Sequence, residues 1–218
     1  MDRPLLSSRI DAATPGLAAR LRAGTHDLHR ASERSGAMVA LRCGKLDRSS
    51  YAVLLVNLQA IYGALEAGLE RHADLFDLPL PLLYRGASLA QDVAALGATP
   101  GTALTQATAC YVQRLQCIGA SAAQEAWLLL AHAYVRYLGD LHGGQLLKRC
   151  IQQSLDLDGQ TGTHFYDFGP PTQVAQLIQE VRAGIDAAPF DAGEIDALVA
   201  EARLSFQLHL ELFEQLPH

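Results

Sequence analysis

The sequence has few cysteines and none of their common metal-binding spacings. Its four cysteines are Cys43, Cys110, Cys117 and Cys150, and no two of them form a CxxC pair. This arrangement argues against a zinc finger or ribbon and against a disulfide framework. We therefore expect four reduced, buried thiols.

Long apolar runs are also missing. Half of the 218 residues are hydrophobic and 18% are charged, a composition that buries a substantial core and argues against disorder. No uninterrupted run approaches the roughly 20 apolar residues of a membrane span, and residues 1–16 lack the apolar core of a signal peptide. We expect a soluble, cytoplasmic, monomeric protein without a membrane partner.

Several catalytic and metal-binding motifs are absent. The sequence contains no P-loop, no GxSxG, no HExxH or HxxxH pair, and no ExxH. Their absence argues against a nucleotide loop, a serine hydrolase elbow, a zincin, and a ferritin-like di-iron centre. The CxxCH motif for covalent haem attachment is missing as well.

Positive charge is scarce outside the first quarter of the chain. Net charge is −6, yet residues 1–48 hold nine Lys/Arg against five Asp/Glu, and the remaining residues hold eight against eighteen. The overall acidity argues against a nucleic-acid partner. The basic first quarter suits an acidic partner or an anionic ligand, and a solvated helix face explains it about as well.

What remains is strongly helical. Apolar residues recur at helical spacing from about residue 14 to the end, with no convincing strand and no internal repeat. Asp47, Ser121 and Asp191 are expected to cap helices, the last two as capping boxes. The sequence predicts an all-α fold of seven or eight helices, with a loose tail over residues 1–13 and a single domain over residues 14–218. The segments 74–86 and 156–171 are predicted to be loops.

Glycines interrupt the longest predicted helix, which spans about residues 121–155. Gly139, Gly143 and Gly144 lie within six positions, although each costs about 1 kcal/mol in a helix interior. Gly139 and Gly143 share one helix face, which is bare for two turns, with the lone carboxylate of Asp140 beside it. Close packing of a second helix and a seat for a flat ligand explain this spacing equally well.

A polar cluster lies on the first predicted helix. Arg22, His29 and Glu33 are seven and four residues apart and fall on one side of the helix. His29 adjoins the apolar stripe, so we expect it to face inward, whereas His26 is expected to face solvent. An inward histidine with a carboxylate one turn away suits a metal ligand, but a core histidine is the more common case.

The two features fit together in one kind of site. Haem iron needs a single protein ligand if its other face is to bind oxygen. A helix with bare glycine backbone can approach the porphyrin closely on that other face. An arginine two turns from the histidine would suit the haem propionates.

These residues resemble a known family. THDLHRASE (25–33) is similar to the proximal-helix motif of haem oxygenases, and HAYVRYLGDLHGGQLLK (132–148) closely resembles their distal-helix signature. The resemblance extends over residues 17–216. It implies the all-α haem oxygenase fold, in which haem lies between the first helix and a kinked distal helix.

The resemblance also implies roles for individual residues. His29 would bind the iron, Glu33 would be its hydrogen-bonding neighbour, and Asp140 would hold a distal water network. The positions expected to contact haem b or line its pocket are Arg22, His29, Glu33, Tyr134, Gly139, Gly143, Arg182 and Phe206, with Tyr51 and Arg136 at further pocket or network positions.

The implied reaction is the opening of haem to biliverdin, carbon monoxide and ferrous iron. It would use O₂ and electrons from an acidic ferredoxin or flavoprotein reductase. The alternatives are a non-catalytic haem carrier or sensor on the same fold, a relative acting on thiamin-type substrates, and a purely structural helical protein.

The chain also departs from the family pattern. His142 stands where animal relatives usually have serine, and we expect it to point away from the iron. Ile178 and Gln179 stand where animal enzymes have a basic propionate contact, which implies that haem could bind in a rotated orientation. The chain ends just after the last predicted helix, as in a bacterial form without the animal membrane anchor.

Overall fold

The computed structural model describes residues 15–97 and 103–216, which form helices and connecting turns with no strand among them. The predicted tail, residues 1–13, lies outside the described residues. The α-helices are α1 Leu17–Arg34, α2 Gly36–Arg42, α3 Arg48–Arg71, α4 Leu80–Leu83, α5 Gly86–Ala95, α6 Gln106–Ala120, α7 Ala123–Ala126, α8 Leu129–Leu155, α9 Pro171–Ala187 and α10 Ala192–Gln215. Two short 3₁₀ helices are η1 Ala73–Leu75 and η2 His164–Tyr166.

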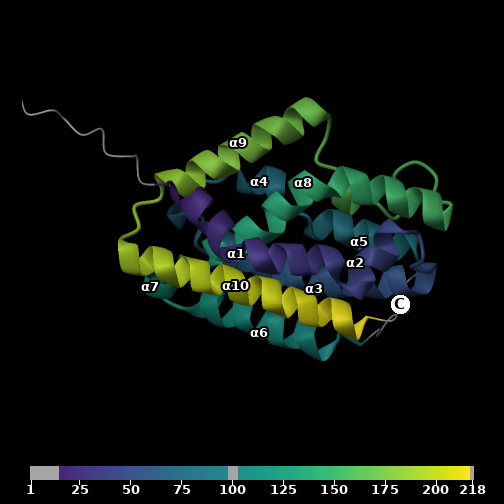
Figure 1. Cartoon of the computed structure of the whole chain (residues 1–218), viewed down its shortest axis with the longest axis horizontal. Coiled ribbons are helices and arrows are strands. Elements are labelled where there is room, and N and C mark those ends of the chain that lie inside the picture. Colours follow the sequence, from purple (N-terminus) through teal and green to yellow (C-terminus); the bar gives the residue numbers. More distant parts are fainter. Residues whose placement is uncertain (1–14, 98–102, 217–218) are drawn as a thin grey trace, which may run out of the picture.

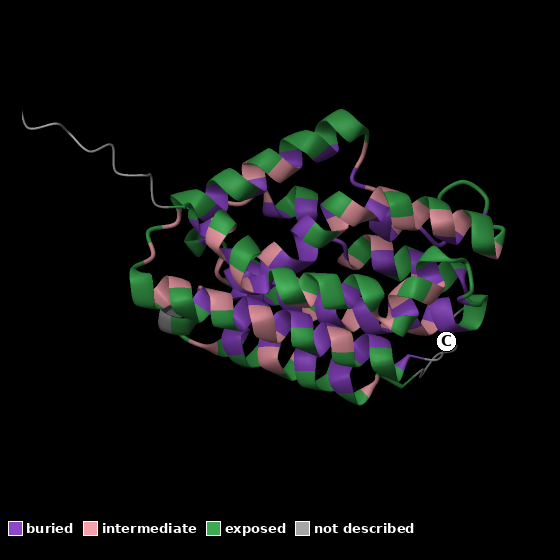
Figure 2. Cartoon of the chain, in the orientation of Figure 1, coloured by how far each residue is buried: buried purple, intermediate pink, exposed green. Residues whose placement is uncertain are grey.

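The helices pack in an arrangement that brings distant parts of the sequence together. Helix α10, the last in the chain, packs against α1, α6 and α8, while α3 packs against α5, α6 and α8 (Figure 1). Buried side chains lie on the faces that these helices turn toward one another (Figure 2). Helix α8 changes direction along its length (Figure 1), as the predicted kink requires.

Helix α3 owes its apolar character to its place in the core. Of the described residues, it forms the one helix that could cross a membrane by length and composition, with a mean hydropathy of 1.5, yet 56% of that window is buried within the fold. Asp47 caps its start as predicted, because its side chain accepts a hydrogen bond from the Ser50 backbone N–H.

The crossing of α3 over α6 depends on two glycines. A Cβ atom at Gly119 would lie 3.1 Å from the Cα of Gly68, and one at Gly68 would lie 3.5 Å from the Cα of Gly119. The two backbones therefore approach so closely that side chains at these positions would push the helices apart. This contact could not be predicted from the sequence, because the two glycines are remote in the chain.

Of the three predicted helix caps, Asp47 and Asp191 are correct and Ser121 is wrong. Asp191 and Glu194 form the predicted capping box of α10. Ser121 does not cap a helix, because it ends α6 and its hydroxyl donates to the Cys117 carbonyl, 2.9 Å away. The predicted helix over 121–155 is accordingly divided into short α7 and long α8.

Three further expectations need correction. Cys43, Cys110 and Cys117 are exposed and Cys150 is partly exposed, so the thiols are not buried. The predicted loop 74–86 contains η1 and α4, and the predicted loop 156–171 contains η2. Helix α2 begins at Gly36, and the break between α1 and α2 falls at the extended Ser35.

Candidate functional site

Helix α1 contributes a histidine with one ring nitrogen that has no hydrogen-bond partner among the described residues. His29 Nδ1 lies 3.9 Å from Glu33 Oε1, beyond hydrogen-bond length, and the ring meets Phe206 of α10 edge-on at 6.0 Å between centroids. No hydrogen bond to Nε2 occurs among the described residues. Glu33 therefore lies on the Nδ1 side, and Nε2 is available to bind a metal.

The prediction that His29 faces inward is wrong, because its side chain is not buried. Its side chain is 53% exposed, although its ring meets the ring of Phe206. In the described part of the chain, no group of three or more His, Cys, Asp or Glu side chains is placed to hold a metal ion. A metal at His29 would thus have one protein ligand, as haem iron does.

Helix α8 presents two glycines to open space. A Cβ atom built on Gly139 or on Gly143 would meet no atom within 4 Å, whereas one on Gly144 would contact Tyr166 at 3.5 Å. Gly144 therefore packs against protein, while the other two form a bare face that no helix of the described residues covers. Of the two explanations of the glycine spacing, the structure favours a seat for a flat ligand.

A side-chain contact joins α1 and α8 next to this face. The Tyr134 hydroxyl of α8 lies close enough to the Thr25 side chain of α1 for that side chain to lower its pKa. Thr25 is one turn from His29, and Tyr134 is five residues, or about 7 Å along the helix, from Gly139. The contact therefore brings the histidine and the glycine face into one neighbourhood.

Two arginines act electrostatically on Tyr134. Burial raises the pKa of the Tyr134 hydroxyl, and the positive charges of Arg22 on α1 and Arg182 on α9 oppose that rise. Among the described ion pairs neither arginine has a carboxylate partner, although Arg20, Arg114, Arg136 and Arg203 each have one. Both side chains are exposed, and this pair of unneutralised cations suits a ligand with two carboxylates.

Asp140 belongs to a buried hydrogen-bonded chain. Tyr62 Oη of α3 donates a short hydrogen bond to Asp140 Oδ2, and Arg136 Nε donates to Tyr62 Oη at 3.2 Å. Arg136 Nη2 also lies 3.8 Å from Asp140 Oδ1. The chain continues to α10, where Arg136 Nη1 donates to His209 Nδ1 at 2.9 Å.

The surroundings of Asp140 in this hydrogen-bonded network let its carboxyl group change protonation state near neutral pH. Burial raises the pKa of Asp140 to about 6, against the opposing effects of Arg136 and the Tyr62 hydrogen bond. Burial and the charge of Arg136 lower the pKa of His209 well below its usual value, so His209 is neutral and accepts from Arg136. Asp140 is thus placed to hold or release a proton beside the glycine face.

Two predicted network positions have different outcomes. Arg136 lies in the Asp140 chain as expected. The Tyr51 hydroxyl instead donates to the Gly162 carbonyl at 2.8 Å and does not contact Asp140. Tyr62, the next tyrosine along α3, contacts Asp140 instead. Neither Tyr62 nor His209 was identified as a site residue from the sequence.

His142 contacts its own helix and α9, and its orientation away from the iron stays a prediction. Its Nδ1 lies 2.6 Å from the Leu138 carbonyl and its Nε2 lies 3.2 Å from Arg182 Nη2. Ile178 on α9 is partly buried and Gln179 is exposed, and neither side chain carries a charge. The positive charge that α9 brings to this site is that of Arg182.

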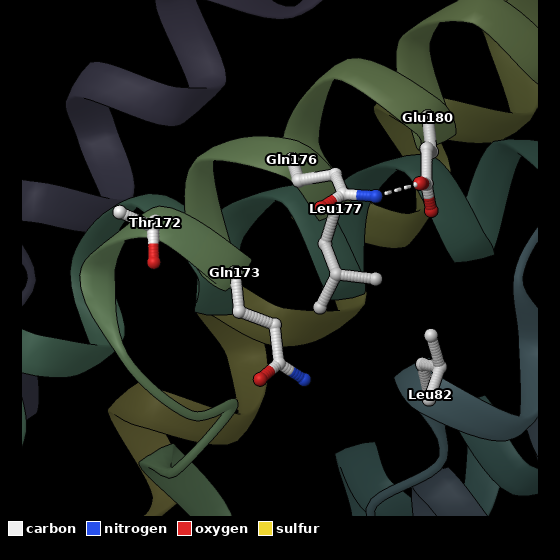
Figure 3. A pocket seen from close by; sticks show the side chains of 6 residues that line it. All are labelled: Leu82, Thr172, Gln173, Gln176, Leu177 and Glu180. Atoms are coloured by element: carbon white, nitrogen blue, oxygen red, sulfur yellow. Dashed lines mark hydrogen bonds between the residues drawn. The ribbon is translucent and has the colours of Figure 1, made fainter.

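A separate surface groove lies on another side of α9. Its lining comes from α4 and α9, namely Leu82, Thr172, Gln173, Gln176, Leu177 and Glu180 (Figure 3). None of the predicted site residues lines this groove.

The residues present fit a haem group. They supply one histidine nitrogen, a helix face without side chains, two cations beside a tyrosine, and an aromatic ring at Phe206. Each matches a part of haem: the iron, the porphyrin plane, the propionates and the apolar macrocycle.

Comparison with known proteins agrees with this assignment. The chain matches the family model described as "Heme oxygenase" over residues 15–215. It is 36% identical to "Heme oxygenase 2" of Synechocystis sp. over 209 residues, which cover 92% of this chain and 82% of that protein. "Heme oxygenase 1" of Bos taurus is 34% identical over 226 residues, covering 99% of this chain and 75% of the relative.

Solved structures show the same fold. The heme oxygenase of Leptospira interrogans is similar with a TM-score of 0.85 and 34% identity, covering 93% of this chain and all of that one (100%). Heme oxygenase-1 of Synechocystis sp., solved in complex with heme, is similar with a TM-score of 0.82 and 30% identity, covering 92% of both chains.

Proposed function

The chain belongs to the haem oxygenase family, and from this premise we propose that it opens haem oxidatively to biliverdin, carbon monoxide and ferrous iron. Haem b is then both substrate and cofactor, and O₂ and external electrons are the co-reactants. The observation that carries the proposal is the Tyr134–Thr25 contact, which brings His29 on α1 and the open face of Gly139 and Gly143 on α8 together.

The chain's own residues hold the substrate at three points. His29 Nε2 binds the iron, with Glu33 on the opposite side of the ring. Arg22 and Arg182 receive the two propionates beside Tyr134. Gly139 and Gly143 let the α8 backbone lie against the porphyrin, since a side chain at either position would extend into that space. When bound, haem supplies the iron that activates O₂ next to its own macrocycle.

Asp140 supplies proton control on the α8 side. With a pKa of about 6, its carboxyl group exchanges a proton near neutral pH. Tyr62 and Arg136 fix the carboxyl orientation through the hydrogen-bonded chain. Asp140 therefore orders water beside the glycine face and passes protons to it.

The electron donor is proposed to be an acidic ferredoxin or flavoprotein reductase. Arg30, Arg34 and Arg42 are exposed on α1 and α2, near His29 in the sequence, and none has a carboxylate partner among the described ion pairs. We propose that the protein acts as a cytoplasmic monomer, as its composition suggests.

A test of the proposal combines product and ligand. The purified chain with haem, O₂ and a reductant should yield biliverdin, identified by its absorption spectrum and by HPLC. His29→Ala should retain the helical circular dichroism spectrum, because the side chain is half exposed, and should lose both the ferric spectrum of the wild type and product formation.

The outcomes separate the candidate functions. Haem binding without biliverdin in the wild type would favour the carrier or sensor alternative. Retention of the parent ferric spectrum and of product by His29→Ala would show that the ligand assignment is wrong.

A further inference from the structure

His142 connects two helices at the site. Its Nδ1 lies 2.6 Å from the Leu138 carbonyl of its own helix, α8. Its Nε2 lies 3.2 Å from Nη2 of Arg182, which is on α9. The imidazole thus ties its own backbone to a guanidinium group on the neighbouring helix.

The chemistry of the two partners assigns the tautomer. A carbonyl oxygen only accepts hydrogen bonds, so His142 Nδ1 carries the proton. A guanidinium only donates, so Nε2 must offer its lone pair. Both contacts form together only with the neutral ring in this one tautomer, and the Leu138 contact therefore prepares Nε2 to receive Arg182.

Arg182 has little else to fix its direction. No carboxylate pairs with it among the described residues, and His142 Nε2 is the hydrogen-bond partner found for its guanidinium in this part of the chain. Its charge acts on the Tyr134 hydroxyl, as the charge of Arg22 also does. One Nη atom is held by His142, and the remaining N–H groups of the planar fork are left for a carboxylate.

We propose that His142 is a positioning residue that aims Arg182 at one carboxylate of the bound tetrapyrrole. This inference rests on the proposed function, because it takes Arg182 as a propionate contact. It assigns a task to a side chain that the proposed function leaves unused. A small side chain at this position could not span from α8 to the guanidinium on α9.

Three variants separate the hydrogen bond from bulk and from fold. His142→Phe keeps a ring of similar size but has no acceptor nitrogen. His142→Gln places an amide oxygen where Nε2 stands, so it restores an acceptor. Arg182→Ala removes the group that His142 is proposed to aim. His142 is exposed, so thermal unfolding of both His142 variants should match the wild type.

The binding experiment uses haem and haem dimethyl ester, in which both propionates are esterified. His142→Phe should raise the Kd for haem about fivefold, a size typical for side chains in contact, and leave the Kd for the ester unchanged. His142→Gln should restore haem affinity. The double variant His142→Phe with Arg182→Ala should bind haem no more weakly than Arg182→Ala alone.

A second readout needs no haem. Arginine side-chain ¹⁵N NMR of the wild-type chain should show a resolved Nη–H signal for Arg182, identified by its loss in Arg182→Ala. This signal should disappear in His142→Phe and return in His142→Gln.

Each result decides the role of His142. Equal loss of affinity for haem and ester, additive effects in the double variant, or an unchanged Arg182 signal in His142→Phe would overturn the inference. A wild type that makes no biliverdin would refute the proposed function, while the affinity ratios and the NMR signal would still report on His142.

Discussion

The carboxyl group of Asp140 is subject to opposing effects. Burial raises its pKa from 3.8 to about 6, while Arg136 and the Tyr62 hydrogen bond act to lower it. Burial is the larger effect, because the side chain is only 9% exposed and the nearest Arg136 nitrogen lies 3.8 Å away. The carboxylate form is therefore costly in the folded chain.

This cost predicts that the folding stability of the chain falls between pH 4 and pH 6. Below about pH 4 Asp140 is protonated in both the folded and the unfolded chain, so the cost is absent. As pH rises to about 6 the folded chain keeps the proton that the unfolded chain loses, and folding stability falls by about 3 kcal/mol. Asp140→Asn keeps an oxygen that accepts from Tyr62 and has no charge to bury. It should raise the Tm of the haem-free chain at pH 7.5 by several degrees, and little at pH 4.

The same variant tests proton control. Asp140→Asn should lower the biliverdin yield, because the amide does not exchange a proton near neutral pH. Thermal unfolding at the two pH values and HPLC of the product are the measurements. An equal gain in Tm at both pH values would contradict the buried-carboxylate argument, and an undiminished yield would contradict the role in proton delivery.

Residues on one helix were the easiest to predict. Arg22, His29 and Glu33 could be grouped from the sequence because helical spacing alone puts them on one side. The tyrosine that contacts Asp140 could not be chosen in this way. Tyr51 and Tyr62 are eleven residues apart, close to three full turns, so they share a face of α3 about 16 Å apart. Which of them meets Asp140 depends on how far along α3 the distal helix crosses it, and this is a tertiary property.

At the scale of single elements, α8 combines two uses of glycine. Gly144 contacts Tyr166, whereas Gly139 and Gly143 face open space. The sequence showed the cluster and its shared face, but the spacing was equally compatible with helix packing. The difference arises from η2, which places Tyr166 against one side of α8 and leaves the other side bare.

The open face predicts a trade between stability and ligand binding. Gly139→Ala and Gly143→Ala should each stabilise the haem-free chain by about 0.5–1 kcal/mol, because alanine favours a helix and its Cβ meets no atom within 4 Å. The same methyl groups should weaken haem binding, because they occupy the space proposed for the porphyrin. Thermal unfolding without haem and spectroscopic haem titration measure the two effects.

Gly144→Ala is the matched control. Its Cβ would make an ordinary contact with Tyr166 at 3.5 Å, on the side away from the open face. This variant should gain similar stability and keep haem affinity. If all three alanine variants bind haem as the wild type does, the glycine face is not the porphyrin seat.

Helix boundaries show why local patterns predict some caps and not others. Asp47 and Asp191 cap as the sequence indicates, because each side chain meets a backbone N–H of its own first turn. Ser121 fits the same pattern, yet its hydroxyl donates to the Cys117 carbonyl of the preceding helix. Where one helix ends next to the start of another, a serine has two backbone partners, and the pattern does not say which it takes.

At the scale of the whole molecule, charge is distributed unevenly over the helices. The negative net charge belongs to residues beyond 48, while α1 and α2 carry the exposed arginines Arg30, Arg34 and Arg42. Neighbouring α1 and α10 residues pair their charges, as Arg20 does with Asp196 and Arg203 with Asp27. The three exposed arginines have no carboxylate partner in the described ion pairs, so their field reaches solvent.

This field predicts the behaviour of the electron donor. The variant with Arg30, Arg34 and Arg42 all changed to Gln should slow turnover driven by an acidic ferredoxin about tenfold at low salt, because docking loses electrostatic steering. Raising the ionic strength should slow turnover by the wild type until its rate equals that of the triple variant, since salt screens exposed charges. Turnover with a small chemical reductant should not change.

Arg71→Gln, at the carboxyl end of α3, is a control that removes a positive charge elsewhere. If the triple variant and Arg71→Gln behave alike with ferredoxin at low salt, the basic surface of α1 and α2 is not where the donor docks.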